Sequence, residues 1–206
     1  MDPRKARTTE AILSAAESLI GQHGVNGVTF KQIGERIGSA NRNVVQYHMG
    51  DMDQMVKHIF AWRLPALEAR RAALLSIAEA EVDAPSVRAL LDILFRPIFE
   101  TVDDEGVRVF ARFLCGVYFS DRMDLRAEFA KTAPVSDRII KMLGRYFDSK
   151  SRQLFPIRLL AVSQMIVSFL ARLDSHSTPP RDEQIFQDLL SISAAALLTP
   201  TTNPSS

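Results

Sequence analysis

Apolar side chains recur every three or four residues along most of this chain, which is the spacing of one face of an α-helix. The first such pattern covers about residues 8 to 23 and stops at Gly24, a residue that often ends helices. Later patterns predict helices near residues 65 to 80, 85 to 101, 105 to 120, 134 to 149, 155 to 173 and 182 to 198. Since no segment is a convincing strand, we expect an all-α fold of about nine to ten helices.

Between the first helix and residue 50, the pattern predicts two short helices separated by a turn. The first begins at Thr29, because Thr29 and Gln32 have the spacing of a capping box, in which each side chain bonds the backbone amide of the other. Turn-forming residues 38–41 end it, and Gly50 ends the second helix. This arrangement is typical of a DNA-reading helix-turn-helix, although a helical hairpin without a DNA role has the same pattern.

The second short helix divides into two faces. Val45, His48 and Met49 share one face, which leaves the opposite face to Arg42, Asn43, Gln46 and part of Tyr47. Arginine pairs with guanine, asparagine and glutamine pair with adenine, and tyrosine and histidine suit phosphate oxygens. We therefore predict contacts to double-stranded DNA from this set of residues: Thr29, Lys31, Asn41, Arg42, Asn43, Gln46, Tyr47, His48 and Lys57.

Residues 8–60 resemble the DNA-binding domain of the TetR family of bacterial transcriptional regulators. The resemblance rests on Thr29-Phe30-Lys31-Gln32-Ile33-Gly34 and on Tyr47-His48-Met49-Gly50, and Asn41 suits the subset whose turn is one residue longer. It implies a three-helix head followed by a helical domain for ligand binding and dimerisation. It further implies a homodimer that represses from a near-palindromic operator and is released when a small effector shifts the helix after the head.

One stretch departs from the family pattern. Where relatives carry Lys or Arg to support a phosphate contact, this chain has Met52, flanked by Asp51 and Asp53. Asp51 makes sense as an N-cap, with Gln54 in position for a second capping box. Either Lys57, one turn further on, takes over the phosphate contact or DNA binding is weaker. The acidic run also keeps a second interpretation open, a helical ligand-binding or scaffolding protein with weak or lost DNA binding.

The predicted organisation has four parts. Residues 1–50 form the DNA-binding head, residues 51–64 a connector helix, residues 65–198 the ligand-binding and dimerisation domain, and residues 199–206 a disordered tail. Pro65 interrupts or kinks the helical pattern and so marks the end of the connector.

Apolar faces in the middle helices either fill a core or line a pocket for a largely apolar effector. The residues we assign to such a pocket are Trp62, Phe95, Phe99, Phe110, Leu114 and Tyr118. By contrast, Arg88, Asp92, Arg96 and Glu100 recur every four residues, which favours a solvated ion-pair stripe.

The last two predicted helices are apolar on more than one side, which favours self-association over a buried monomer core. In the final helix, one seam contains Ile185 and Ile192 and the other Phe186 and Leu190, so one seam can face the core and the other a partner. We assign this set to a homodimer interface: Leu159, Val162, Ile166, Phe169, Leu170, Ile185, Leu189 and Ile192.

Charge and composition restrict the remaining possibilities. The formal net charge is only +1, so any DNA contact is local. A cationic N-terminal arm of Arg4, Lys5 and Arg7 either contacts DNA or is a solubilising disordered end. The apolar segment 154–173 is interrupted by Arg158, so we expect no membrane insertion.

Other chemistries find little support. The single Cys115 excludes an intramolecular disulfide, and with no signal-peptide pattern at the N-terminus a cytoplasmic location fits. His23, His48, His58 and His176 lack metal-ligand spacing, and the chain has no phosphate-binding glycine loop or nucleophile motif. We therefore expect no enzyme activity, no metal and no cofactor.

Overall fold

The computed structural model describes residues 3–39, 44–81, 84–120, 132–149, 151–173 and 179–200. Within them it has nine α-helices, two short 3-10 helices and no strand, so the all-α prediction is confirmed. The helices of the N-terminal half are α1 (Pro3–His23), α2 (Phe30–Arg36), α3 (Val44–Met49) and α4 (Met52–Glu81), with η1 (Val25–Gly27) between the first two. The others are α5 (Val87–Glu100), α6 (Val109–Tyr118), α8 (Pro134–Gly144), η2 (Arg152–Leu154), α9 (Phe155–Leu170) and α10 (Pro179–Leu198).

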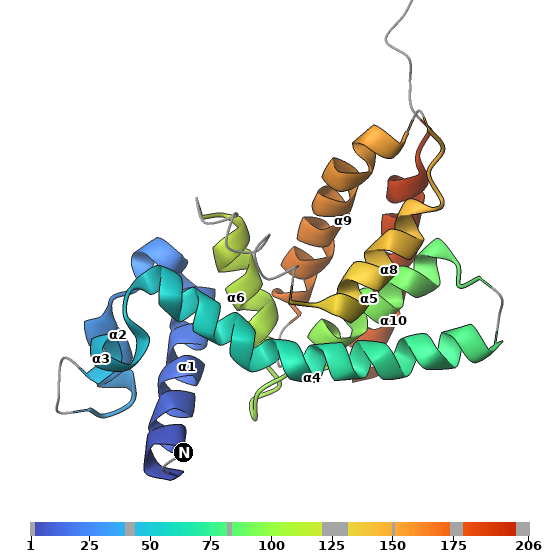
Figure 1. Cartoon of the computed structure of the whole chain (residues 1–206). Helices are drawn as coiled ribbons and strands as arrows, with labels where there is room; N and C mark the ends of the chain where they lie inside the picture. The colour runs from blue at the N-terminus through green and yellow to red at the C-terminus, as the bar shows by residue number, and fades with distance from the viewer. Residues whose placement is uncertain are drawn as a thin grey trace, which may run out of the picture.

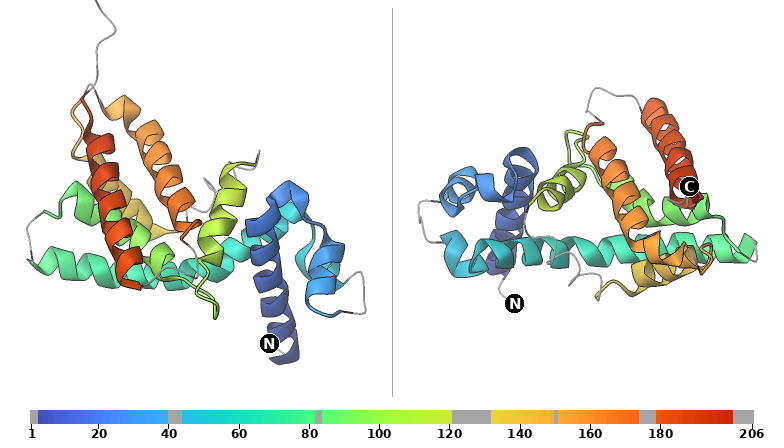
Figure 2. Two further views of the ribbon diagram at one scale, coloured as in Figure 1. Left: turned by 180° about the vertical axis from the view of Figure 1, so that it is seen from behind. Right: turned by 90° about the horizontal axis from the view of Figure 1, so that it is seen from above.

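The long helix α4 extends from one end of the molecule to the other (Figure 1). At one end it packs with α1 and α3, which form the head together with α2. Along the rest of its length it packs with α5 and α8, and α9 and α10 complete the body. Figures 1 and 2 agree that α6 lies between the head and the body.

Pro65 does not divide α4, so the predicted separate helices over 51–64 and 65–80 are wrong. A proline inside a helix costs about 3 kcal/mol, because it removes one backbone donor and crowds the preceding turn. Buried apolar side chains before Pro65, such as Ile59, and after it, such as Leu67 and Leu75, hold both halves of α4 against the same core. Their burial offsets the cost, and the connector continues without a break into the body.

Other helix ends differ from the prediction for local reasons. Helix α1 begins at Pro3, so the backbone of the cationic arm at Lys5 and Arg7 is helical. Helix α8 ends at Gly144, and the chain after it turns so that Phe147 packs on Phe155, with ring centroids 4.9 Å apart. At the C-terminus, the carbonyl of Thr199 accepts a hydrogen bond from Arg158 (2.5 Å); residues 201–206 of the predicted tail lie outside the described residues.

Helices α1 and α6 are in very close contact. A Cβ atom added to Gly116 of α6 would lie 2.8 Å from the carbonyl oxygen of Ile20, and one added to Gly21 of α1 would lie 2.9 Å from Arg112 Cβ. Beside this contact, the buried carboxylate of Glu17 on α1 accepts two hydrogen bonds from Arg63 on α4, at 2.7 and 2.5 Å. The head is therefore fixed to the body by close backbone packing and a bidentate ion pair.

The sequence suggested that the charged stripe on α5 is solvated, but part of it packs against another helix. Arg96 pairs with Asp92 on its own helix (2.8 Å) and with Glu183 on α10 (2.6 Å). Beside it, the rings of Phe99 and Phe186 stack with centroids 4.5 Å apart. The stripe thus joins α5 to α10, a contact between distant segments that four-residue spacing does not reveal.

Candidate functional site

The first helix of the predicted helix-turn-helix begins as expected. The Thr29 amide donates to the Gln32 side chain (2.8 Å), and the Gln32 amide donates to the Thr29 hydroxyl (3.3 Å), so the capping box is confirmed. The helix ends at Arg36 and is followed by Gly38, whose positive φ of 66° suits glycine. Asn41, Arg42 and Asn43, all predicted DNA-contacting residues, lie outside the described residues.

Helix α3 has one buried and one exposed face. Val45 is fully buried and Met49 is 3% exposed, while Gln46 is exposed and Tyr47 is 83% exposed. His48 is half-buried, and its ring meets the Tyr47 ring edge-on at 5.3 Å. The predicted division of this helix into faces is therefore observed for its described residues. The exposed face presents an amide and a phenol, two groups that can bond bases or phosphates.

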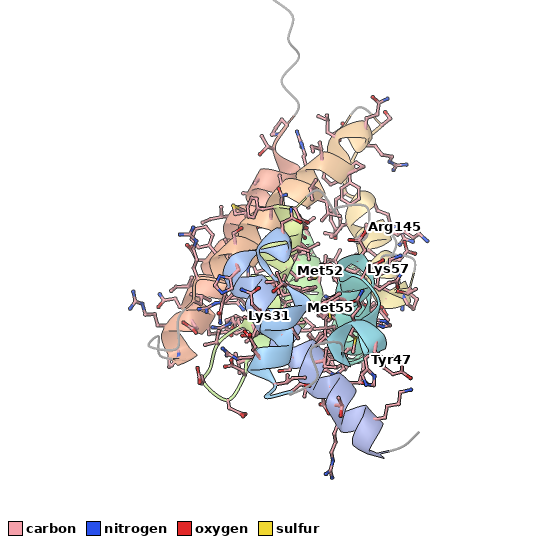
Figure 3. All side chains as sticks on the ribbon, turned by 90° about the vertical axis from the view of Figure 1, so that its left-hand side faces the viewer. Lys31, Tyr47, Met52, Met55, Lys57 and Arg145 are labelled. Carbon is pink, nitrogen blue, oxygen red and sulfur yellow. The ribbon has the colours of Figure 1, made fainter. Side chains whose placement is uncertain are left out.

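Other predicted DNA-contacting residues surround this face. Figure 3 views the molecule from the side of the head and labels Lys31, Tyr47 and Lys57. Thr29 and Lys31 are exposed, and Lys31 forms a solvated ion pair with Glu35 (3.7 Å). Lys57 lies half-buried on α4. The structure thus brings residues of α2, α3 and the first turns of α4 together at one end of the molecule.

The acidic flank has a structural explanation. The Asp51 carboxylate accepts a hydrogen bond from the Gln54 amide at 2.8 Å, so it caps α4. Asp53 stands in the first turn of α4, where the helix dipole favours a negative charge. Met52 packs against the apolar core, and a Lys or Arg at this position would not make the same apolar contact. These residues stabilise the start of α4, which is a role independent of DNA.

A cavity of about 490 Å³ lies in the body, with walls from α4, α5, α6, α8 and α9. Four of the six predicted pocket residues line it, namely Phe95, Phe110, Leu114 and Tyr118. Trp62 and Phe99 are not among its lining residues, so their assignment to the pocket is wrong. Phe99 is used in the stack with Phe186, and the guanidinium of Arg63 covers the ring of Trp62 at 4.2 Å.

Three polar residues of the cavity wall were missed from the sequence: Arg71, Ser136 and Ser163. Arg71 is 6% exposed and donates to the Leu94 carbonyl (3.0 Å) and to Glu68 (3.2 Å). Burial lowers the pKa of Arg71, and Glu68 opposes that shift. A sequence signal existed, because Leu67, Arg71 and Leu75 share one face at four-residue spacing, so an arginine interrupts an apolar stripe.

Glu68 is held as a carboxylate by the start of α8. It accepts hydrogen bonds from the Val135 amide (2.8 Å) and the Ser136 hydroxyl (2.5 Å) as well as from Arg71. Burial by itself raises the pKa of Glu68, but the hydrogen bonds from Ser136, Val135 and Arg71 outweigh it, so the pKa lies below the usual value.

The residues assigned to a dimer interface fall into two groups. Four are buried within the single chain and so unavailable to a partner, namely Val162, Ile166, Leu170 and Leu189, and Leu159 lines the cavity. Phe169 is 52% and Ile192 51% exposed, and Ile185 is half-buried. Ile157 and Leu198, which the sequence did not single out, are also exposed. A helix that packs against the core of its own chain must bury one of its faces, which explains why these four residues are buried.

The segment Arg152–Leu170 is long and apolar enough to cross a membrane by length and composition alone, and 28% of it is buried in the chain. Core helices of soluble proteins meet the same criterion. Here the exposed remainder includes Ile157 and Phe169, which are candidates for contact with another surface.

Comparison with known proteins supports the fold. A crystal structure described as the TetR family transcriptional regulator PfmR from Thermus thermophilus superposes with a TM-score of 0.54, covering 89% of this chain and 96% of that chain at 18% sequence identity. No family model and no curated protein sequence matches the chain. The fold is thus that of the TetR family regulators, a head of three helices joined to a helical body, as the sequence resemblance implied.

Proposed function

We propose that this protein is a DNA-binding transcriptional regulator whose helix α3 reads the major groove. The observation that carries the proposal is the division of α3: Val45 and Met49 hold it on the head, while Gln46 and Tyr47 face outward. Short exposed helices with this construction suit insertion into a groove about as wide as a helix. Its place of action would be the cytoplasm, where bacterial DNA lies.

The protein would bind DNA as a homodimer. The two subunits would meet through the exposed apolar side chains of α9 and α10. Phe169, Ile192 and Ile157 are each more than half exposed. Large side chains of this kind are typical anchors of protein interfaces. A two-fold dimer presents two copies of α3 to successive major grooves about 34 Å apart, so the operator should be nearly palindromic.

A small effector would release the operator by binding in the cavity of the body. Helix α4 supports this link, because its first turns pack against the head and its residues Leu64, Leu67 and Arg71 line the cavity. An effector that binds better to one position of α4 would shift the spacing of the two heads. Repression relieved by ligand is therefore the form of regulation we propose.

Binding to the DNA upstream of the protein's own gene tests this function. With fluorescence anisotropy at moderate salt, we expect a sequence-preferring complex that Gln46→Ala weakens by about 1 to 3 kcal/mol, the value of one good base contact. Gln153→Ala is the matched control, because Gln153 is an exposed glutamine on η2 in the body. An unchanged sequence preference in Gln46→Ala would remove Gln46 from base reading.

A second candidate function is a helical ligand-binding or scaffolding protein without DNA binding. The carboxylates of Asp51 and Asp53 beside the head favour it, because they oppose DNA phosphates. No sequence-preferring complex at moderate salt, together with an intact dimer, would support this second function and contradict the first.

A further inference from the structure

Arg71 is the single charged side chain among the described residues that line the cavity, and most of the wall around it is apolar. Only 6% of the residue is exposed, so its guanidinium is not a solvated surface group. Placing a cation in such a wall costs free energy unless bonds compensate for it. A buried arginine in the wall of a cavity therefore raises the question of what its guanidinium binds.

The protein satisfies only part of the guanidinium. Arginine has five N–H donors. Nε donates to the Leu94 carbonyl (3.0 Å) and Nη1 to Glu68 (3.2 Å), whereas Nη2 has no partner in the described part of the chain. In that part, the buried side-chain atoms without a partner are Asp182 Oδ1 and Ser193 Oγ, so Nη2 is still in contact with accessible space. Because Arg71 lines the cavity, that space is the cavity.

The charge beside Arg71 is incompletely balanced. Its partner Glu68 also accepts bonds from the Val135 amide (2.8 Å), the Ser136 amide (3.3 Å) and the Ser136 hydroxyl (2.5 Å). One carboxylate is thus shared between a guanidinium and the positive end of α8, which has about half an elementary charge. The site keeps a partial positive charge and free N–H donors on the cavity side.

We propose that the cavity takes an amphipathic monocarboxylate, whose carboxylate bonds to Arg71 and whose hydrocarbon body fills the apolar remainder. This inference rests on the proposed function, since it names the chemical class of the effector. Guanidinium groups match carboxylates in geometry and form charge-assisted bonds with them. A head group with two charges fits less well, because Glu68 lies 3.2 Å from Arg71 and would repel the second charge.

The rest of the cavity suits a hydrocarbon body. Phe60, Phe95 and Phe110 contribute aromatic rings, and Leu160 and Val167 contribute aliphatic groups from α9. The volume of about 490 Å³ falls within the range of small-molecule sites, roughly 300 to 1,000 Å³. A straight or aryl-substituted chain would remove this apolar surface from water.

Titration calorimetry of the full-length protein tests the inference with three probes of equal chain length: a medium-chain fatty acid, its methyl ester and the corresponding alcohol. We expect the acid to bind at least about tenfold more tightly than the ester or alcohol, because only the acid forms charge-assisted bonds. In Arg71→Met this preference should disappear, while the ester binds as in the unaltered protein. Retained ester binding shows that the variant still folds around its cavity.

The matched control is Arg70→Met. Arg70 is the preceding residue of α4, lies at the surface in an ion pair with Glu100 (2.8 Å) and does not line the cavity, so its removal should leave the preference for the acid unchanged. Arg71→Lys, which keeps the charge but loses the planar fork, should retain part of the preference.

Three results would overturn the inference: no binding of the acid, an ester that binds as tightly as the acid, or an acid preference that survives in Arg71→Met. Each is independent of the regulator function, because DNA binding is measured on the ligand-free protein. If the protein binds its operator but prefers the ester, the proposed function stands and the proposed class of effector is wrong. If the protein prefers the acid but does not bind its operator, the carboxylate site stands and the proposed function is wrong.

Discussion

The head and the cavity use polar side chains in opposite ways. On α3, Gln46 and Tyr47 are exposed on a helix that is held to the head by the buried apolar side chains of Val45 and Met49. In the cavity, Arg71 is buried and bonded to Leu94 and Glu68. Exposed polar residues can be exchanged with little effect on folding, whereas buried bonded ones contribute to both folding and binding. Substitutions at Gln46 and Tyr47 should therefore alter DNA binding at constant stability, whereas substitutions at Arg71 should alter both ligand binding and stability.

The largest effect should come from the ion pair that joins the two regions. Arg63→Ala leaves Glu17, whose side chain is 1% exposed, as a buried carboxylate without its guanidinium. Breaking a buried pair in this way costs about 3 kcal/mol. We expect urea denaturation to show that loss, together with weaker DNA binding, because α1 braces the reading head.

Arg70→Ala is the control for that experiment, since its pair with Glu100 is about 40% exposed on both sides (45% and 37%). A solvated pair is worth at most about 1 kcal/mol. Equal losses of stability in the two variants would contradict the view that a buried pair fixes the head to the body.

A smaller effect is expected at the outer face of the body. Phe169→Asp places a charge on the exposed apolar surface of α9, and if this surface is the dimer interface, dimerisation should weaken by about 2 kcal/mol, as for a central anchor. Light scattering across a concentration series measures the change. DNA affinity should fall with it although no residue of the head is altered.

Phe119→Asp provides the matched control for the dimer experiment. Phe119 is 78% exposed but follows α6, outside α9 and α10. If the two variants dimerise equally strongly, the dimer interface does not include Phe169.

Local signals allowed the head to be predicted in more detail than the cavity. The capping box of Thr29 and Gln32 and the two faces of α3 depend on residues within one turn of each other, so spacing alone reveals them. The cavity depends on five helices that meet from distant parts of the sequence. Spacing identified the apolar residues Phe95, Phe110, Leu114 and Tyr118, but it could not show that Phe99 stacks on Phe186 instead.

Arg71 and Pro65 illustrate two further limits. The bonds from Arg71 to Leu94 and from Glu68 to Val135 cross between helices, and no one-dimensional pattern specifies such partners. Pro65 is a strong local signal for a helix end, yet tertiary packing on both sides of it outweighed that signal. Local rules fail here because the free energy comes from contacts that are distant in sequence.

The smallest effect is expected at the start of the reading unit. Thr29→Ala removes the hydroxyl that accepts the Gln32 amide (3.3 Å) and leaves that amide to water, so α2 should lose about 1 kcal/mol of local stability. Hydrogen exchange of the α2 amides measures this loss, and Thr29→Ser, which keeps the hydroxyl, should restore protection. Amides of α5 and α9 should exchange at unchanged rates, because the cap is exposed and remote from the cavity. A uniform increase across all helices would instead mean that head and body unfold as one cooperative unit, and the contrast between the two regions would then be limited to their surfaces.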